Sequence, residues 1–415
     1  MALDLALASL ILSPNPNPPN VPSFPLPLKT PIITCSATKN KQMVRRDPSL
    51  DNQASKQNRL RFVQKLKTLI LSKPRRFIPL SLLHRCRSYL SLPSPRPLLP
   101  IIHRYPSLFD LFHLPNHFSD STLCVRLTPA AAALAARESI LRDRLSDSLA
   151  SKLQKLLMLS PPHHRLLLSK LVHLAPDLGL PPDFRSRLCN SHPDRFRTVD
   201  TSYGRALELV SFDPSLAVPI PVKQPRRLSG LIVDRPLKFK HLSLRRGVNL
   251  KRKHREFLIR FGDFPEAPVY STEEGLEGLS AEMEEKRACG VVREVLGMTV
   301  ERRTLVDHLT HFRKEFRLPN RLRGMLVRHP DMFYVSIKGQ RDSVFLVEDY
   351  DDNGVLLVRD ELLELKEGLV ELVREGKRMR RERRQRAAAG DLGFGGGGSE
   401  SDSEDENEED GFVGE

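Results

Sequence analysis

The feature that most constrains the fold is a pattern that recurs three times along the chain. Each copy has a short helical run, an aromatic residue or His followed by Pro, then Phe, then alternating residues. The copies are Leu98–Phe112, Asp183–Val199 and Leu322–Ile337. The Pro stops the helix and moves the preceding residue out of the right-handed helical region. The Phe can then fold back onto the helix that has just ended, so the chain is expected to form similar small units.

A β-hairpin pattern follows these segments. Alternating residues flank turns at Tyr203-Gly204 and at Lys338-Gly339, with a further turn at Asp352–Gly354, whereas the strand signal after the first segment is weaker. Helices followed by a hairpin resemble a winged-helix unit, which serves in nucleic-acid binding and in protein interaction. The expected fold class is α+β, mainly helical, with repeated helix–Pro–Phe–β-hairpin (winged-helix-like) units and disordered termini. The alternative is a coincidence among Leu-rich helices.

Periodic apolar residues predict the helices themselves. Leu60, Val63, Leu66 and Ile70 follow helical spacing, and Pro74 ends that helix. Thr128 is expected to be the N-cap of the next long helix, with Pro129 as its first residue. The other predicted helices are Leu80–Leu90, Leu98–Arg104, Pro129–Leu159, His163–Leu174, Pro182–Asn190, Lys251–Phe261 and Asp360–Arg386.

The two ends of the chain differ in composition from the rest. Residues 1–38 contain a single acidic residue, Asp4, and no basic residue before Lys29, which is typical of an organelle transit peptide. No positive segment precedes the apolar run, which disfavours a secretory signal, and the lack of Arg before Arg45 favours the chloroplast over the mitochondrion. Residues 390–415 are expected to be a Gly-rich linker and a disordered acidic tail.

Between these ends we expect one RNA-binding region over residues 45–386. Its possible sub-units are 45–160, 161–222 and 300–386, with a basic connector at 223–265. No apolar run approaches the length of about 18 residues that a membrane span needs.

The charge balance indicates a polyanionic partner. The chain has 66 Lys and Arg against 51 Asp and Glu, a formal net charge of +15, and eight of the acids lie in Ser399–Asp410. Without that segment the remainder of the chain carries +23. A surface this basic attracts nucleic acid, and the alternative is that the charge serves solubility alone.

The positive charge is concentrated in three stretches: Arg59–Arg76, Arg245–Arg255 and Lys377–Arg386. In the second stretch, Phe257 and Phe261 follow the basic run, a combination that suits phosphate contacts together with packing or stacking. Charge and position give the candidate RNA-binding residues as Arg59, Arg61, Lys65, Lys67, Arg75, Arg76, Arg245, Arg246, Lys251, Arg252, Lys253, Arg255, Arg321, Arg323 and Arg328.

Motifs for catalysis or metal binding are missing from the sequence. It has no phosphate-binding loop of the G-x-x-x-x-G-K-[ST] type, no H-E-x-x-H and no G-x-S-x-G. The five cysteines form no C-x-x-C pair, which argues against a zinc site. A nuclease using Asp349, Asp351 and Asp352 with Mg²⁺ is only weakly supported, since Asp is favoured in turns. We therefore expect no enzyme activity, no cofactor and no metal.

Four segments resemble the plant organelle RNA recognition (PORR) domain family. They are RRDPSLD at Arg45–Asp51, RLRFVQKLKTLILSKP at Arg59–Pro74, KRKHREFL at Lys251–Leu258 and the more specific segment Phe316–Tyr350. The resemblance implies import into chloroplasts or mitochondria. It also implies binding to organellar intron RNA, typically group II, and support of splicing without catalysis, together with other splicing factors. The alternative is a protein-interaction scaffold in an organellar splicing or ribosome-associated complex.

Overall fold

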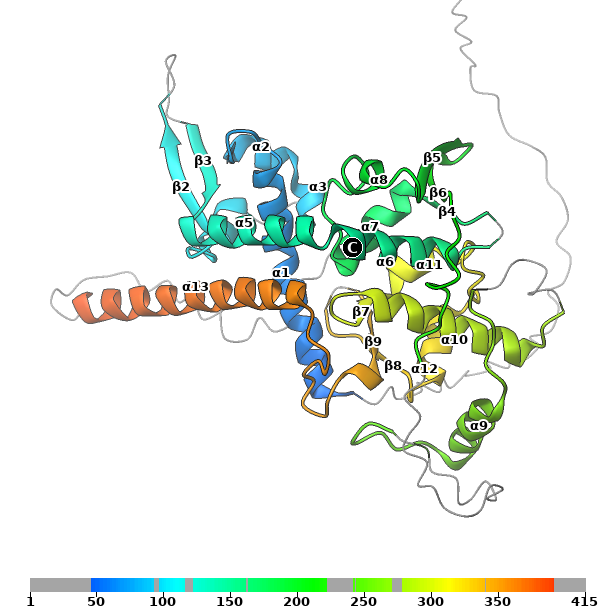
Figure 1. Ribbon diagram of the computed structural model, residues 1–415. Helices are drawn as coiled ribbons and strands as arrows, with labels where there is room; N and C mark the ends of the chain where they lie inside the picture. Colours follow the sequence, from blue (N-terminus) through cyan, green and yellow to red (C-terminus); the bar gives the residue numbers. More distant parts are fainter. Residues whose placement is uncertain are drawn as a thin grey trace, which may run out of the picture. The chain divides into compact units, whose positions relative to one another are not determined.

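The computed structural model describes residues 46–92, 97–115, 122–161, 163–221, 242, 244–270, 278–339 and 341–391. The predicted transit peptide at residues 1–38 and the acidic tail lie outside these ranges. The fold is α+β and mainly helical, with three small antiparallel sheets, which confirms the expected class (Figure 1).

Short strands and strand pairs are interspersed among the helices along the chain. The helices are α1 (Pro48–Leu71), α2 (Leu80–Arg85), α3 (Arg87–Leu90), α4 (Leu98–His103), α5 (Pro129–Arg144), α6 (Ser146–Met158), α7 (Leu168–Leu178), α8 (Leu188–Ser191), α9 (Arg252–Asp263), α10 (Ala281–Met298), α11 (Val306–His311), α12 (Leu322–Arg328) and α13 (Glu361–Asp391). The strands are β1 (Phe77–Pro79), β2 (Phe109–Leu114), β3 (Thr122–Leu127), β4 (Arg165–Leu167), β5 (Phe196–Thr201), β6 (Gly204–Leu209), β7 (Arg303–Leu305), β8 (Phe333–Ser336) and β9 (Ser343–Leu346).

The same unit occurs three times. We call α1 to β3 repeat 1, α6 to β6 repeat 2, and α10 to β9 repeat 3. In each repeat a helix leads into a short strand, further helices follow, and a hairpin closes the unit. The short strand pairs with the second strand of the hairpin, giving the orders β1-β3-β2, β4-β6-β5 and β7-β9-β8. This is the winged-helix arrangement that the repeated pattern predicts.

The His-Pro or Tyr-Pro step forms the same turn in every repeat. The amide of the Phe donates a hydrogen bond to the carbonyl oxygen four residues earlier, at 3.0, 3.1 and 2.9 Å in the three repeats. The donor and acceptor pairs are Phe109 and Tyr105, Phe196 and His192, and Phe333 and His329. All three Phe side chains are buried. The prediction that this Phe folds back into the unit is thus confirmed.

Two positions in each repeat hold a left-handed backbone, 15 residues apart. The first directly precedes the short strand. The second ends a helix in repeats 1 and 2 and a run of turns in repeat 3, and the next Leu amide bonds to the carbonyl oxygen five residues earlier. Such a bond is characteristic of a Schellman cap. The positions are 76 and 91, 164 and 179, and 302 and 317, and Gly179 is the one glycine among them. The buried residues that follow the second position are Leu92, Leu180 and Leu318.

Several sequence predictions require correction. The predicted helix Pro129–Leu159 is two helices, α5 and α6, separated at Leu145, and Leu80–Leu90 is divided into α2 and α3. The first residues of the predicted helix His163–Leu174 form β4, because they pair with β6 of the distant hairpin. In Pro182–Asn190 only the last residues are helical, as part of α8. The short strands and α10 were not predicted.

The apolar residues form two main cores. Repeats 2 and 3 share one core, and repeat 1 has its own. Helix α13 contributes Leu362 to the shared core and Leu369 to the core of repeat 1. Helix α1 has Leu66 in the core of repeat 1, while Leu50 packs with Phe345 of repeat 3. Helix α13 therefore connects the two main cores, and α1 connects the core of repeat 1 with a small apolar cluster on repeat 3.

The left-handed glycine in repeat 2 provides a test of this packing. A Cβ on Gly179 would lie 2.7 Å from Leu362 Cδ1 and 2.9 Å from Val300 Cγ2, and its φ is +81°. Gly179→Ala should destabilise the fold by at least about 2 kcal/mol, because the left-handed conformation alone costs about 1–2 kcal/mol. Urea unfolding measures the change.

The matched control is Gly262→Ala in α9, where a Cβ would meet nothing within 4 Å. This change should be neutral or stabilising, by less than about 1 kcal/mol, since Ala has the higher helix propensity. Equal unfolding midpoints for the two variants would contradict the packing described for Gly179.

Candidate nucleic-acid interface

A large cleft of about 2480 Å³ lies between the two cores. It is lined by α1, α3, α5, α7 and α13, and by residues of repeat 3. Its basic lining residues are Arg61, Lys65, Lys67, Arg75, Arg76, Arg126, Arg142, Arg185, Arg187, Arg303, Arg341 and Lys366. Its acidic lining residues are Glu138, Asp143, Asp177, Asp183 and Glu301. Basic side chains therefore outnumber acidic ones by more than two to one.

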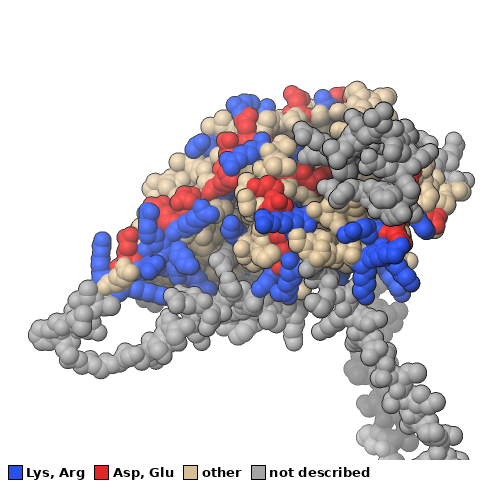
Figure 2. Space-filling view, turned by 90° about the horizontal axis from the view of Figure 1, so that it is seen from below, with Lys and Arg blue, Asp and Glu red and all other residues tan. Residues whose placement is uncertain are grey.

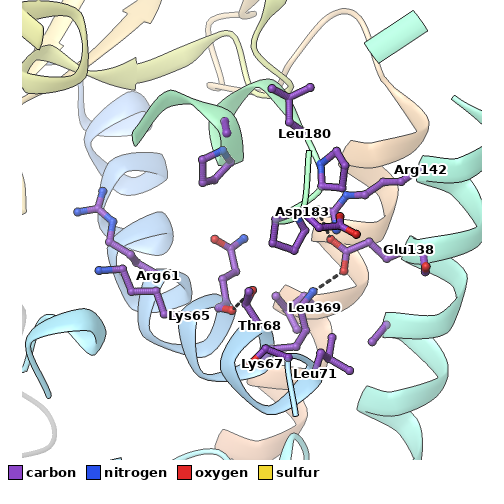
Figure 3. A pocket seen from close by; sticks show the side chains of 18 of the residues that line it. Arg61, Lys65, Lys67, Thr68, Leu71, Glu138, Arg142, Leu180, Asp183 and Leu369 are labelled. Carbon is purple, nitrogen blue, oxygen red and sulfur yellow. Dashed lines mark hydrogen bonds and ion pairs between the residues drawn. The ribbon is translucent and has the colours of Figure 1, made fainter. Parts of the chain in front are cut away.

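Part of this charge is neutralised inside the protein. Lys67 of α1 pairs with Glu138 of α5, which also pairs with Arg142 at 2.7 Å (Figure 3). Burial works to raise the pKa of Glu138, but Lys67 and Arg142 lower it overall. Lys67 is 8% exposed, so its contribution is to hold α1 against α5.

Other cleft cations have no acidic partner among the described residues. They are Arg61, Lys65, Arg75, Arg76 and Arg185. Four of these five were predicted from the sequence, and the structure brings them together in one cleft. Figure 3 shows Arg61 and Lys65 projecting from one side of α1, whereas Lys67 projects from the other side toward Glu138. Unpaired cations in a hollow surface attract an anion.

Burial and neighbouring positive charges lower the pKa of Lys65. The partial burial of its amine, followed by the positive charges of Arg61 and Arg341, lowers its pKa to about 8. Lys65 Nζ donates a hydrogen bond to Ser91 Oγ at 2.6 Å and lies 5.7 Å from the centre of the Tyr89 ring. Burial also lowers the pKa of Arg61.

A second group of predicted residues forms what we call the α9 surface. Arg246, Lys251, Arg252, Lys253 and Arg255 are exposed at the start of α9 or just before it. The α9 surface also includes three exposed residues on or beside α12, namely Arg321, Arg323 and Arg328. Lys and Arg gather in separate groups in the view of Figure 2, with acidic residues between them.

Contacts hold α9 beside the end of α12. A ring nitrogen of His254 lies 2.7 Å from the carbonyl oxygen of Arg328, and the rings of Phe257 and Phe261 pack on His329. Three of its cations have acidic neighbours, in the pairs Arg252–Glu256, Arg323–Asp342 and Arg328–Glu285. The rest have no ion pair among the described residues.

Arg245 differs from the other predicted residues because it is buried. Its side chain is 5% exposed, pairs with Asp47 and donates to Ser49 Oγ at 3.0 Å. Asp47 also caps α1 by accepting from the amide of Ser49 at 2.9 Å. Although burial acts to raise the pKa of Asp47, the Ser49 hydroxyl and Arg245 lower it. Arg245 therefore fixes the start of α1 and presents almost no surface to a ligand.

Four residues complete the comparison of the sequence prediction with the structure. The side chain of Arg59 lies outside the described residues. Arg185, Arg341 and the exposed ring of Tyr89 line the cleft but were not predicted. Each is a single residue in an ordinary stretch of sequence, and only the approach of the repeats makes it part of the cleft.

The described part of the chain contains neither a cluster of metal-binding side chains nor a membrane-spanning helix. No group of three His, Cys, Asp or Glu side chains there is arranged to hold a metal ion. None of its helices combines the length and the apolar character needed to cross a membrane.

Comparison with known proteins identifies the family. Residues 45–378 match the plant organelle RNA recognition (PORR) domain. The chain therefore belongs to the PORR family, as its sequence motifs predicted. No solved structure matches the chain significantly.

Three plant relatives are similar over most of this chain. Protein WHAT'S THIS FACTOR 1, chloroplastic, of Zea mays is 43% identical, over 79% of this chain and 66% of the relative. The homologue of Oryza sativa is 41% identical, over 88% of this chain and 71% of the relative. That of Arabidopsis thaliana is 39% identical, over 79% of this chain and 62% of the relative. All three are named chloroplastic, which supports the predicted chloroplast localisation.

The difference between Arg245 and its neighbour Arg246 gives a prediction. Arg245→Gln should reduce the free energy of unfolding by about 3 kcal/mol, because it leaves the Asp47 carboxylate without its buried partner. Arg246→Gln, at an exposed position, should change it by less than about 0.5 kcal/mol. Urea unfolding of the two single variants tests this, and similar stabilities would refute the structural role of Arg245.

Proposed function

We propose that this protein binds intron RNA in the chloroplast stroma and promotes splicing of group II introns without catalysing it. The observation that carries the proposal is the cleft, where unpaired cations gather in a protein of the PORR family. The exposed cations of the α9 surface extend the area available for phosphate contacts. The names of the relatives support the compartment.

The charge distribution favours binding through contacts with the phosphate backbone of the RNA. Arg and Lys side chains that face phosphates release counterions, and this supplies much of the affinity for RNA. In the proposed role the protein holds or orders the intron while the RNA performs the chemistry. Other splicing factors are expected to join it in a ribonucleoprotein complex.

Salt dependence tests the binding itself. The purified protein should bind a group II intron RNA with an affinity that falls steeply with salt, with a log–log slope of about −0.7 for each single-strand phosphate contact. Electrophoretic mobility shift at several salt concentrations measures the slope. Absence of binding at physiological salt would overturn the proposal.

The α9 surface is tested by reversing its charge. Replacing Lys251, Arg252, Lys253 and Arg255 together by Glu should weaken RNA binding at least about tenfold, since four phosphate-facing charges are inverted. The matched control exchanges Lys for Arg and Arg for Lys at the same positions, which retains the charge and should preserve most of the affinity. If the Glu variant binds as well as the control, the α9 surface does not contact RNA.

The second candidate function is a protein-interaction scaffold. It is favoured by exposed apolar side chains in and after the hairpin of repeat 2, namely Tyr203, Val210, Phe212 and Val218. Immunoprecipitation from isolated chloroplasts, with and without ribonuclease, separates the two functions. Enrichment of one or a few introns supports RNA binding, whereas protein partners that survive ribonuclease, without intron enrichment, support the scaffold.

A further inference from the structure

Three cations from two distant parts of the chain converge in the cleft. Arg61 and Lys65 lie one helical turn apart on α1, so their side chains share a face. Arg341 precedes β9 in the hairpin of repeat 3 and is 53% exposed. Its positive charge acts on both α1 residues.

The described residues do not neutralise this cluster. Arg61 makes no hydrogen bond or ion pair with the described residues, and Lys65 bonds only to the Ser91 hydroxyl. Asp177 is the acidic residue whose charge favours Arg61. However, its carboxylate already accepts from Thr304 Oγ1 at 2.6 Å and contacts His308 Nδ1 at 3.0 Å. Arg341 has only a distant partner, Asp307 at 3.8 Å.

Such a cluster opposes folding. Like charges held close together and partly removed from water repel one another, and the cost is larger when no acid compensates for it. Functional sites can retain groups of residues that lower the stability of the free protein. A bound anion would compensate for the repulsion among these three cations.

We propose that Arg61, Lys65 and Arg341 hold a phosphodiester of the bound RNA, and that Tyr89 stacks on an adjoining base. This subsite rests on the proposed function, that the protein binds RNA. Guanidinium groups match phosphate oxygens with paired donors, and Lys65 adds a compact charge. The ring of Tyr89 is 46% exposed and lies beside Lys65. An unpaired base can stack on an exposed ring, so the subsite accepts a single strand.

Neutral variants test the phosphate contact. Arg61→Gln, Lys65→Met and Arg341→Gln are each expected to weaken binding of a fluorescein-labelled single-stranded RNA about tenfold. Each should also make the log–log salt slope shallower by about 0.7. Lys56→Met, an exposed change on α1 outside the cleft, is the matched control and should leave both quantities unchanged.

Thermal unfolding without RNA separates a binding role from a structural one. Removing a repelled cation should leave the Tm of Lys65→Met and Arg61→Gln equal to that of the wild type or raise it. A structural role would lower the Tm and leave RNA affinity per folded molecule unchanged, which overturns the subsite. Arg341→Gln lies on a different element and is exposed, so it tests the subsite even if an α1 variant does not fold.

The pH dependence of binding gives an independent readout. The groups that face Lys65 are Arg61, Arg341, Tyr89, Ser91 and His173. Because its pKa in the free protein is about 8, Lys65 loses its charge as the pH rises through 8, and RNA affinity should fall with it. Lys65→Arg stays charged and should bind RNA with little change between about pH 7 and 9. Identical pH profiles for this variant and the wild type count against Lys65 as a contact.

The stacking contact is tested with Tyr89→Ala and Tyr89→Phe. The alanine variant should lose about tenfold in affinity for the single strand, while the phenylalanine variant retains most of it. If the wild type binds RNA but all these variants bind like Lys56→Met, the subsite is wrong and the proposed function stands. If the wild type itself does not bind RNA, the proposed function fails and the subsite fails with it.

Discussion

The cleft depends on two long helices, each of which joins the core of repeat 1 to another part of the protein. Helix α1 begins in a set of polar contacts with repeat 3, where Asp51 accepts from the Tyr334 hydroxyl at 2.8 Å, and it ends in the core of repeat 1. Helix α13 connects the same two regions through Leu362 and Leu369. Both helices line the space between the cores, and side chains of α1 face it.

The charges of this protein divide into two kinds by their surroundings. Arg245 and Lys67 are buried, meet a carboxylate and stabilise the arrangement of α1. Arg61 and Lys65 face the cleft, have no acidic partner in the part of the chain that the structure describes, and repel each other. Lys67 thus favours folding, whereas Lys65, two residues away on the same helix, opposes it. This difference explains why a count of basic residues indicates a polyanionic partner but does not locate the contact.

The repeat could be predicted from the sequence because it is carried by local stereochemistry. Pro193 and Pro330 follow the last turn of a helix and cannot continue its hydrogen bonding, and the following Phe196 and Phe333 are large apolar side chains that need a core. The short strands could not be predicted, since Arg165–Leu167 and Arg303–Leu305 become strands only by pairing with a hairpin about 40 residues away. Three residues carry too little alternation for a pattern to be recognised.

The sequence by itself determined the fold class, the three helix–Pro–Phe–hairpin units, the PORR family and an excess of positive charge. These follow from local residue preferences, motif order and composition, which need no knowledge of distant contacts. The tertiary structure alone decided which cations are buried as ion pairs and which line the cleft. It also brought Arg341 and Tyr89 toward Lys65. Burial and charge pairing depend on residues far apart in the chain, and only the packing of the repeats on the connecting helices sets those distances.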